Sequence, residues 1–401
     1  MAIRRLSSFF AVVTVVALLA LEIAITPAVA SGTGKVTNYR AASISDPPWI
    51  VVGSDGNFWF TNQKTNSIGR ITTTGHVTNY TGRGISGPDG IAAGSDGALW
   101  FCNENNNSIG RITTAGQVSN YTGRGISGPD EIVAGPDGAL WFSNVKTSAI
   151  GRITTAGHVT IYTGSGINGP KGVTAGPDGA VWFTNEGSAS IGRLDPATGR
   201  VRTFTGPGID IPFGIVTGPD GALWFTNRGN NSIGRITTTG HVTNYRGPGV
   251  SNPDGIAVST GGALWFTNHG NNSIGRITTS GHINNYTGTG INGPDGIVAG
   301  PDGAMWFTNQ SGNSIGRITT NATPQISGFT PTSGAPGATV TIRGINLSRA
   351  SKVTFAGSAA TISSDTATTI VTTVPTGASS GHISVTTRAG TTTSSQTFTV
   401  S

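Results

Sequence analysis

Apolar and polar positions along this chain repeat together about every forty residues. Each copy contains a Trp-Phe pair inside a short apolar run, and turn-forming residues flank the run on both sides. The pairs start at Trp59, Trp100, Trp141, Trp182, Trp224, Trp265 and Trp306, which are 41, 41, 41, 42, 41 and 41 residues apart. A repeat of this length, rich in β-forming and turn residues, is typical of a β-propeller blade. Seven copies predict seven blades.

Each repeat divides into four short strands joined by tight turns. The second strand is apolar at every position, as expected for a strand that packs against a neighbouring blade on either side. An Asp-Gly turn of the hairpin type precedes it, and an Asn-rich loop follows it. In the second copy we expect the strands at residues 90–93, 98–102, 108–112 and 118–121.

The two ends of the repeat region complement each other. Residues 35–39 read as an outer strand with no blade before it, whereas the last repeat stops after Ile318 without an outer strand of its own. We therefore predict that residues 36–39 pair with the strand around Ile315. Such pairing would close the ring and leave no exposed sheet edge at the seam.

The period stops beyond residue 321, and short alternating runs separated by Gly and Pro follow. They predict a small all-β sandwich over residues 324–401. The region resembles the immunoglobulin-like IPT/TIG family in Pro324-Gln325-Ile326, Pro331-Thr332-Ser333-Gly334, Thr341-Ile342-Arg343-Gly344 and Val374-Pro375. That resemblance implies a spacer or adhesive module.

Residues 1–30 read as an export signal. Arg4 and Arg5 precede an apolar run over residues 9–21, and Ala28-Val29-Ala30 has the small residues of a cleavage site. Because Glu22 ends a run that is short for a bilayer span, we expect cleavage rather than an uncleaved anchor. The mature propeller would then occupy residues 31–320, without a transmembrane span, in a secreted or cell-surface protein.

Charge and cysteine content narrow the classes of partner. Only 10% of residues are charged, and the formal net charge of +6 includes seven arginines that follow Ile-Gly once per repeat. These arginines are spread around the ring instead of forming a basic stripe, so we expect no nucleic-acid partner. Cys102 is the single cysteine, which excludes an intramolecular disulfide.

Candidate binding residues lie where the chain leads into the first strand of each blade. This position holds Asp89, Asp130, Asp254 and Asp295 in four blades, and Pro48, Lys171 and Phe213 in the other three. The strand directions place all seven around one mouth of the central channel. Four carboxylates there would suit a magnesium or calcium ion, although each Asp could instead cap its own turn. The sequence predicts no other cofactor.

A second ring is formed by the asparagine that ends strand two in every blade. Its amides would suit sugar hydroxyls, with Asn268 and Asn309 as candidate ligand contacts, but they would equally suit holding the ring together. Most histidines precede outer strands on the opposite face, too far apart to share a metal. The seven asparagines are Asn62, Asn103, Asn144, Asn185, Asn227, Asn268 and Asn309.

The blade pattern Pro-x-Gly-Ile, Gly-Pro-Asp-Gly-x-Leu-Trp-Phe-Thr, Ile-Gly-Arg-Ile-Thr, Gly-x-Val-x-x-Tyr resembles the streptogramin (virginiamycin B) lyase family over residues 35–320. The resemblance implies a magnesium-dependent lyase that opens the ester of cyclic depsipeptides by elimination. It also implies a His where blade six has Asp254, a Glu-Pro-His where blade seven has Gly293-Pro294-Asp295, and a Glu near Asn309 or Gln310.

The residues at these positions favour binding over catalysis. An elimination needs a base of near-neutral pKa, and an Asp replaces His poorly unless its pKa is raised. Seven nearly identical blades also suit a repeated binding surface better than one pocket of unlike groups. We therefore expect an exported binding or scaffold protein whose mouth contacts a polar small molecule, a glycan or a cell-wall component. The alternatives are a lyase with a rearranged site and a purely structural or adhesive surface protein.

Overall fold

The computed structural model of this chain describes residues 34–320, 323–347, 350–366, 368–387 and 390–401. The expected export signal lies outside these ranges. Within them, no helix is both long and apolar enough to cross a membrane. Regular structure there consists of β-strands and three single turns of 3₁₀ helix, η1 (Val145–Thr147), η2 (Glu186–Ser188) and η3 (His269–Asn271).

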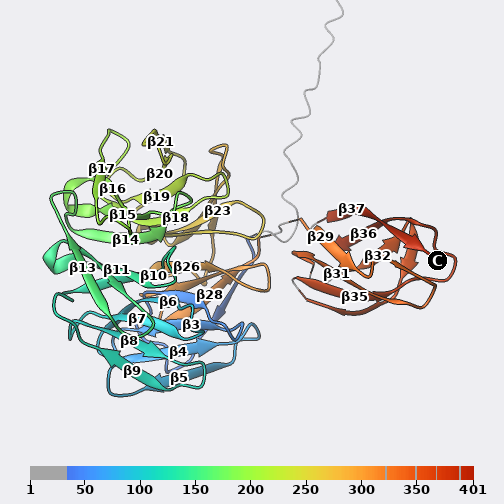
Figure 1. The fold of residues 1–401 in the computed structure, drawn as a ribbon, viewed down its shortest axis with the longest axis horizontal. Coiled ribbons are helices and arrows are strands. Elements are labelled where there is room, and N and C mark those ends of the chain that lie inside the picture. Colours follow the sequence, from blue (N-terminus) through green and yellow to red (C-terminus); the bar gives the residue numbers. More distant parts are fainter. Residues whose placement is uncertain (1–33, 321–322, 348–349, 367, 388–389) are drawn as a thin grey trace, which may run out of the picture. The chain divides into compact units, whose positions relative to one another are not determined.

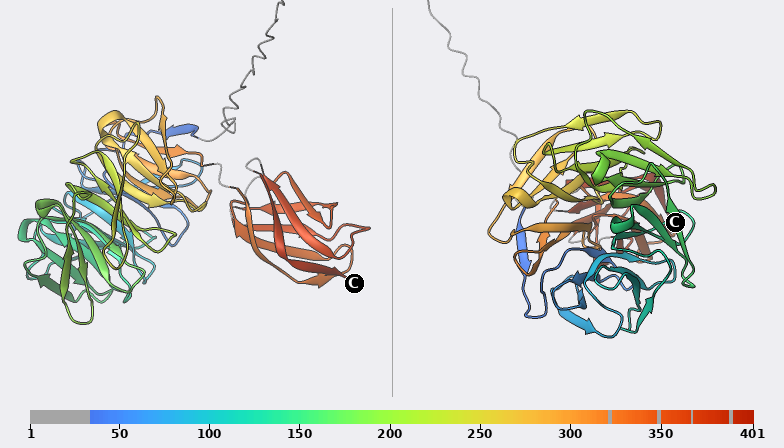
Figure 2. Two further views of the ribbon diagram at one scale, coloured as in Figure 1. Left: turned by 90° about the horizontal axis from the view of Figure 1, so that it is seen from above. Right: turned by 90° about the vertical axis from the view of Figure 1, so that its left-hand side faces the viewer.

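Seven four-stranded antiparallel sheets form the propeller, and Figure 2 (right) looks onto the ring of blades. The first three blades comprise β2 (Ile50–Val52), β3 (Phe58–Asn62), β4 (Ser67–Ile71) and β5 (Val77–Thr81); β6 (Pro88–Ala93), β7 (Leu99–Asn103), β8 (Ser108–Ile112) and β9 (Val118–Tyr121); and β10 (Pro129–Ala134), β11 (Leu140–Asn144), β12 (Ala149–Ile153) and β13 (Val159–Thr163).

The remaining blades repeat this order, and Figure 1 labels many of their strands. They comprise β14 (Pro170–Ala175), β15 (Val181–Asn185), β16 (Ser190–Leu194) and β17 (Val201–Phe204); β18 (Pro212–Thr217), β19 (Leu223–Asn227), β20 (Ser232–Ile236) and β21 (Val242–Tyr245); β22 (Pro253–Val258), β23 (Leu264–Asn268), β24 (Ser273–Ile277) and β25 (Ile283–Thr287); and β26 (Pro294–Ala299), β27 (Met305–Asn309), β28 (Ser314–Ile318) and β1 (Val36–Tyr39).

The second strand of each blade is the hydrophobic centre of the propeller. All five residues of β7 are fully buried, because Trp100 and Phe101 point to opposite sides and fill the spaces towards the two neighbouring blades. The Trp100 indole stacks on Tyr121 of the outer strand, with ring centroids 5.1 Å apart. The same stack, with Tyr or Phe, recurs in every blade.

The N-terminal strand closes the ring as predicted. β1 pairs antiparallel with β28, so that Val36 faces Ile318 and Tyr39 faces Ile315. The blue β1 lies beside the orange strands of the last blade in Figure 2 (right). Tyr39 then stacks on Trp306 at 5.1 Å, which restores in blade seven the aromatic stack of the other blades.

On the face opposite the channel mouth, an Asp in the turn before strand two links two side chains in six blades. In blade five, Trp224 Nε1 donates to Asp220 Oδ1 at 3.0 Å, and Arg235 Nε donates to Asp220 Oδ2 at 2.7 Å. Burial raises the pKa of Asp220, but these hydrogen bonds outweigh it and the pKa lies below its ordinary value. The six aspartates are Asp55, Asp96, Asp137, Asp178, Asp220 and Asp302.

Blade six departs from this arrangement. Gly261 occupies the place of the Asp, and the buried Trp265 Nε1 has no hydrogen-bond partner among the described residues. Ser259 stands where all six other blades have glycine before Pro-Asp or Ser-Asp, and it donates its hydroxyl to the Ala263 carbonyl at 2.9 Å. The turn itself is unchanged, since the Ser259 amide still donates to Ala263 and that of Gly262 to Ser259.

The C-terminal region forms a sandwich of two sheets around its own core, which includes Val340, Ile342, Ile383 and Phe398. One sheet contains β29 (Gln325–Thr330), β31 (Thr339–Ile345), β35 (Thr369–Thr373) and β34 (Ile362–Asp365). The other contains β30 (Ser333–Gly334), β37 (Gly390–Val400), β36 (Gly381–Thr387), β32 (Lys352–Phe355) and β33 (Ser358–Ala360).

Candidate functional site at the channel mouth

A β-bulge presents the predicted mouth residues. In blade three Pro129 pairs with Asn144 and Ile132 with Phe142, so the two residues between Pro129 and Ile132 lie outside the regular ladder. The same irregularity opens the first strand of blades two to seven. Bulges often re-aim side chains next to functional sites. The first strand therefore starts earlier than expected in blade two, at Pro88 instead of Gly90, and Asp89 lies within the bulge.

The glycine that follows most of these residues is required by close packing around the channel. A Cβ at Gly214 would lie 2.6 Å from the carbonyl oxygen of Asp254 in the next blade. The inner strands thus approach each other by their backbones. As a result, the side chain just before each glycine is carried close to its counterparts in neighbouring blades.

Two cations flank the Phe213 ring at the mouth. The Arg228 guanidinium lies over the ring, with Cζ 3.2 Å from the ring centroid, and Lys171 Nζ lies 5.9 Å from the same centroid. Arg228 Nε donates to Asp254 Oδ1, and Lys171 Nζ lies 2.7 Å from Asp130 Oδ2. Residues of blades three to six therefore form a continuous arc of carboxylate, cation, aromatic ring, cation and carboxylate, which we call the mouth arc.

Asp254 is the most deeply buried member of the mouth arc, with 2% of its surface exposed. Burial raises its pKa, and the charges of Arg228 and His269 offset only part of that effect. His269 Nδ1 lies 3.6 Å from Asp254 Oδ2, and this buried nitrogen has no hydrogen-bond partner among the residues that the structure describes. His269 begins η3, directly after β23, so an imidazole and a buried carboxyl group meet at the mouth.

Asp89 and Asp295 differ from the paired carboxylates. Among the described residues, no group donates a hydrogen bond to either carboxyl, and both side chains keep partial access to solvent. Burial, followed by the nearby Asp254 carboxylate, raises the pKa of Asp295 to about 8. Burial and the charge of Asp130 raise the pKa of Asp89 well above its usual range. At neutral pH Asp295 is therefore chiefly protonated and can donate a hydrogen bond.

The contacts of the aspartates bear on both roles considered for them. Asp130 and Asp254 each pair with a cation from another blade. Among the described residues, no three or more His, Cys, Asp or Glu side chains are arranged to hold a metal ion.

The strand-two asparagines are fully buried and occupied by the protein itself. Asn309 Oδ1 accepts from the Asn292 amide at 3.0 Å, and Asn309 Nδ2 donates to the Gly290 carbonyl at 2.8 Å. Asn268 likewise accepts from the Ser251 amide at 3.0 Å. These amides hold each blade to the connection that precedes it, which is the second of the two roles considered for them.

The residues present do not fit the magnesium ion that the family resemblance implies. Of the corresponding positions, Asn309 is engaged inside its blade, and Gln310 uses its backbone amide to bind the Gly293 carbonyl at 2.8 Å. Neither side chain carries the carboxylate that a hard cation favours. We derive no catalytic step through a metal.

Sequence reasoning found the positions of Lys171 and Phe213 but read them only as departures from Asp, and it missed Arg228. The sequence did contain a signal, because the two blades that carry Lys171 and Phe213 instead of Asp are neighbours in the ring. Their cationic and aromatic side chains lie between two blades with Asp, a pattern that favours ion pairing across blades.

Comparisons with known proteins agree with this fold. The model of the virginiamycin B lyase family matches residues 24–208 and 163–345, and that of the IPT/TIG domain matches residues 324–400. The solved structure of virginiamycin B lyase from Staphylococcus aureus is 34% identical, with a TM-score of 0.65, and the match covers 71% of this chain and 99% of that one. No curated protein sequence matches the chain.

Two further structures are similar over the same part. A streptogramin B lyase is 32% identical with a TM-score of 0.67, and the match covers 71% of this chain and 97% of that one. A catalytically inactive histidine-to-alanine variant of the Staphylococcus aureus enzyme, solved with quinupristin, is 34% identical with a TM-score of 0.66 and coverages of 71% and 99%.

Proposed function

The chain belongs to the virginiamycin B lyase family, and from that premise we propose that it is an exported member which binds a glycan or cell-wall component at the channel mouth. The observation that carries this proposal is the charge state of the mouth. Asp130 and Asp254 are neutralised by their cation partners. Asp295, with a pKa of about 8, holds its proton at neutral pH, and burial together with the charge of Asp130 raises the pKa of Asp89.

A neutral mouth of this kind suits a polyhydroxylated ligand better than a cation. Protonated carboxyl groups donate and accept hydrogen bonds, as sugar hydroxyls do. The Phe213 ring, although largely buried, stiffens the mouth arc through its two cation contacts. Binding sites commonly combine such a rigid frame with a few polar groups that converge on the ligand.

The test is a glycan array that includes peptidoglycan fragments, followed by isothermal titration calorimetry on the hits. Asp295→Ala should weaken binding about tenfold, the loss of one hydrogen bond to a ligand, whereas Asp295→Asn should retain most of it because the amide still donates. Binding to the natural chain should weaken as the pH rises past about 8. An array without hits, or a hit that Asp89→Ala and Asp295→Ala leave unchanged, would refute the proposal.

One observation favours a second function, a depsipeptide lyase with a rearranged site. His269 lies beside Asp254, the position that corresponds to the family histidine of blade six. A carboxylate next to an imidazole can hold it as a general base. In a β-elimination the base would take a proton from carbon while the ester C–O bond breaks, and the linear product would have the mass of the cyclic substrate.

This alternative has its own assay. The mature protein is incubated with a streptogramin B depsipeptide, with magnesium or with EDTA, and chromatography with mass spectrometry detects the isomeric linear product. Ring opening that His269→Ala abolishes would establish the lyase function and overturn the binding proposal as the main role. Absence of product at high enzyme concentration, with the Staphylococcus aureus enzyme as the positive control, would exclude it.

A further inference from the structure

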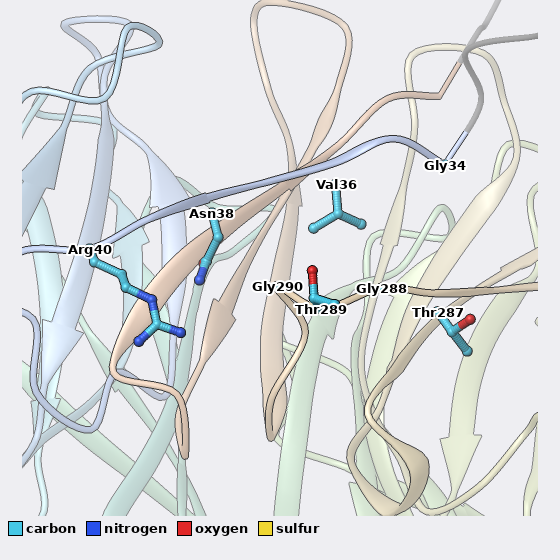
Figure 3. A pocket seen from close by; sticks show the side chains of 8 residues that line it. All are labelled: Gly34, Val36, Asn38, Arg40, Thr287, Gly288, Thr289 and Gly290. Carbon is cyan, nitrogen blue, oxygen red and sulfur yellow. The ribbon is translucent and has the colours of Figure 1, made fainter.

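A cavity lies at the seam of the ring, away from the channel mouth. Its volume is about 390 Å³, and its walls come from β1 and from the connection between β25 and β26 (Figure 3). We call it the seam groove. It is lined by Gly34, Val36, Asn38, Arg40, Thr287, Gly288, Thr289 and Gly290.

The polar groups of the seam groove favour an anion that also carries hydroxyls. Arg40 is exposed and makes no ion pair or hydrogen bond with any residue that the structure describes, and no acidic side chain lines the cavity. The Thr289 hydroxyl points towards β1, which carries Asn38 and is followed directly by Arg40 (Figure 3). The groove therefore combines one free guanidinium with neutral groups that can bind hydroxyls.

Two glycines keep the floor of the groove open. A Cβ at Gly290 would lie 3.1 Å from the Asn38 Cβ and 3.2 Å from Val36 Cγ1, and one at Gly288 would lie 3.4 Å from Val36 Cγ2. The connection therefore runs directly under β1. Among the described residues, the amides of Gly288, Thr289 and Gly290 have no backbone hydrogen-bond partner, so they can donate to a ligand.

The other blades do not repeat the combination of Arg40 and Thr289 that lines the seam groove. After the outer-strand aromatic residue, the other blades carry Thr, except blade five, where Arg246 stands. The connection beside Arg246 makes the same glycine contact, since a Cβ at Gly208 would lie 3.2 Å from the Asn244 Cβ. This connection, however, has Pro207 in the place of Thr289. Proline offers neither a hydroxyl nor an amide donor, so blade five supplies a matched control.

We propose that the seam groove binds a sugar acid, such as a hexuronic acid unit of an acidic polysaccharide. A planar carboxylate matches the fork of the Arg40 guanidinium, and the sugar hydroxyls match Thr289 and the free amides. The volume lies within the range of small-molecule sites. This site is separate from the channel mouth and does not depend on the function proposed there.

The test is calorimetric titration of the mature protein with galacturonic acid and with a short oligogalacturonide, with glucose as the neutral control. Arg40→Ala should weaken galacturonate binding about tenfold to hundredfold, as expected for a lost charge-assisted pair. Arg246→Ala and Asp295→Ala should leave it unchanged. Thermal unfolding of each variant checks that β1 still closes the ring, and Arg40→Lys provides a second, milder replacement.

Several results would overturn the proposal. One is the absence of galacturonate binding at millimolar concentration. Another is equal weakening by Arg40→Ala and Arg246→Ala, which would indicate general attraction to basic side chains. Glucose 6-phosphate binding more tightly than galacturonate would reject the sugar-acid class in favour of a phosphate ligand. Loss of binding in Asp295→Ala alone would place the ligand at the mouth.

Discussion

Blade six offers a direct test of the Asp-Trp-Arg links on the face opposite the mouth. The double replacement Ser259→Gly/Gly261→Asp should stabilise the propeller, because it supplies the acceptor that Trp265 Nε1 lacks. Both changes are needed. In blade five, a Cβ at the position corresponding to Ser259 would lie 2.7 Å from Asp220 Oδ1. Serine at that position therefore excludes the carboxylate, and Gly261→Asp alone would be strained.

The magnitude follows from the contacts in the other blades. Satisfying a buried donor contributes about 1–3 kcal/mol. The renewed ion pair with Arg276 adds about 0.2–1 kcal/mol, since its counterparts are roughly one-fifth exposed. Loss of the Ser259 hydroxyl bond costs about 1 kcal/mol, and the glycine gained at 259 offsets the one removed at 261. The net gain is about 1–2 kcal/mol, or about 2–6 °C in Tm for a domain of this size.

Differential scanning calorimetry at a fixed scan rate would measure the effect. The converse replacement in blade five, Gly218→Ser/Asp220→Gly, is the matched control and should lower Tm by a similar amount. The reasoning would be refuted if the blade-five variant had a lower Tm but the Tm of the blade-six variant did not exceed that of the natural chain. In that case the missing acceptor for Trp265 Nε1 would not limit the stability of blade six. If neither variant changes Tm, the links contribute nothing measurable.

Three further outcomes follow from the structure. Deletion of residues 31–40 should lower Tm substantially in calorimetry, because it removes β1 and the Tyr39–Trp306 stack; an unchanged transition would refute the closure argument. Arg228→Ala should cost about 3–5 kcal/mol in denaturant unfolding by removing the arginine partner of the buried Asp254 carboxylate, and Asp254→Asn in the same chain should recover part of the loss. The folded state keeps the Asp295 proton up to about pH 8, whereas the unfolded state releases it near pH 4. The free energy of unfolding should therefore fall as the pH rises between these values, and it should fall less steeply in Asp295→Asn.

The fold was predictable from sequence because its determinants are local and periodic. The Trp-Phe pairs mark the second strands, and the missing outer strand after Ile318 indicated its partner at residues 36–39. Each of these conclusions needs only the repeat and the twofold alternation of a strand. None requires the distance between side chains of different blades.

The mouth was less predictable because its chemistry depends on such distances. Lys171, Phe213 and Arg228 come from blades four and five, and only the ring brings them between Asp130 and Asp254. The asparagines were ambiguous for another reason. An asparagine that bonds the protein's own backbone and an asparagine that binds a sugar look the same in the sequence. Only the hydrogen-bond partners in the structure distinguish them.

The closing strand also bears on how the molecule assembles. β1 is synthesised first, yet its partner β28 is made about 280 residues later, so the seam can close only once the last blade has been made. Lys35 and Thr319, joined at 3.1 Å in the finished ring, are among the most distant contacts in the chain, and such contacts form slowly. Until then an unpaired edge is exposed on β28. The β1 strand of a second molecule has the same sequence and could pair with that edge. A high concentration of incompletely folded chains should therefore favour strand-swapped oligomers.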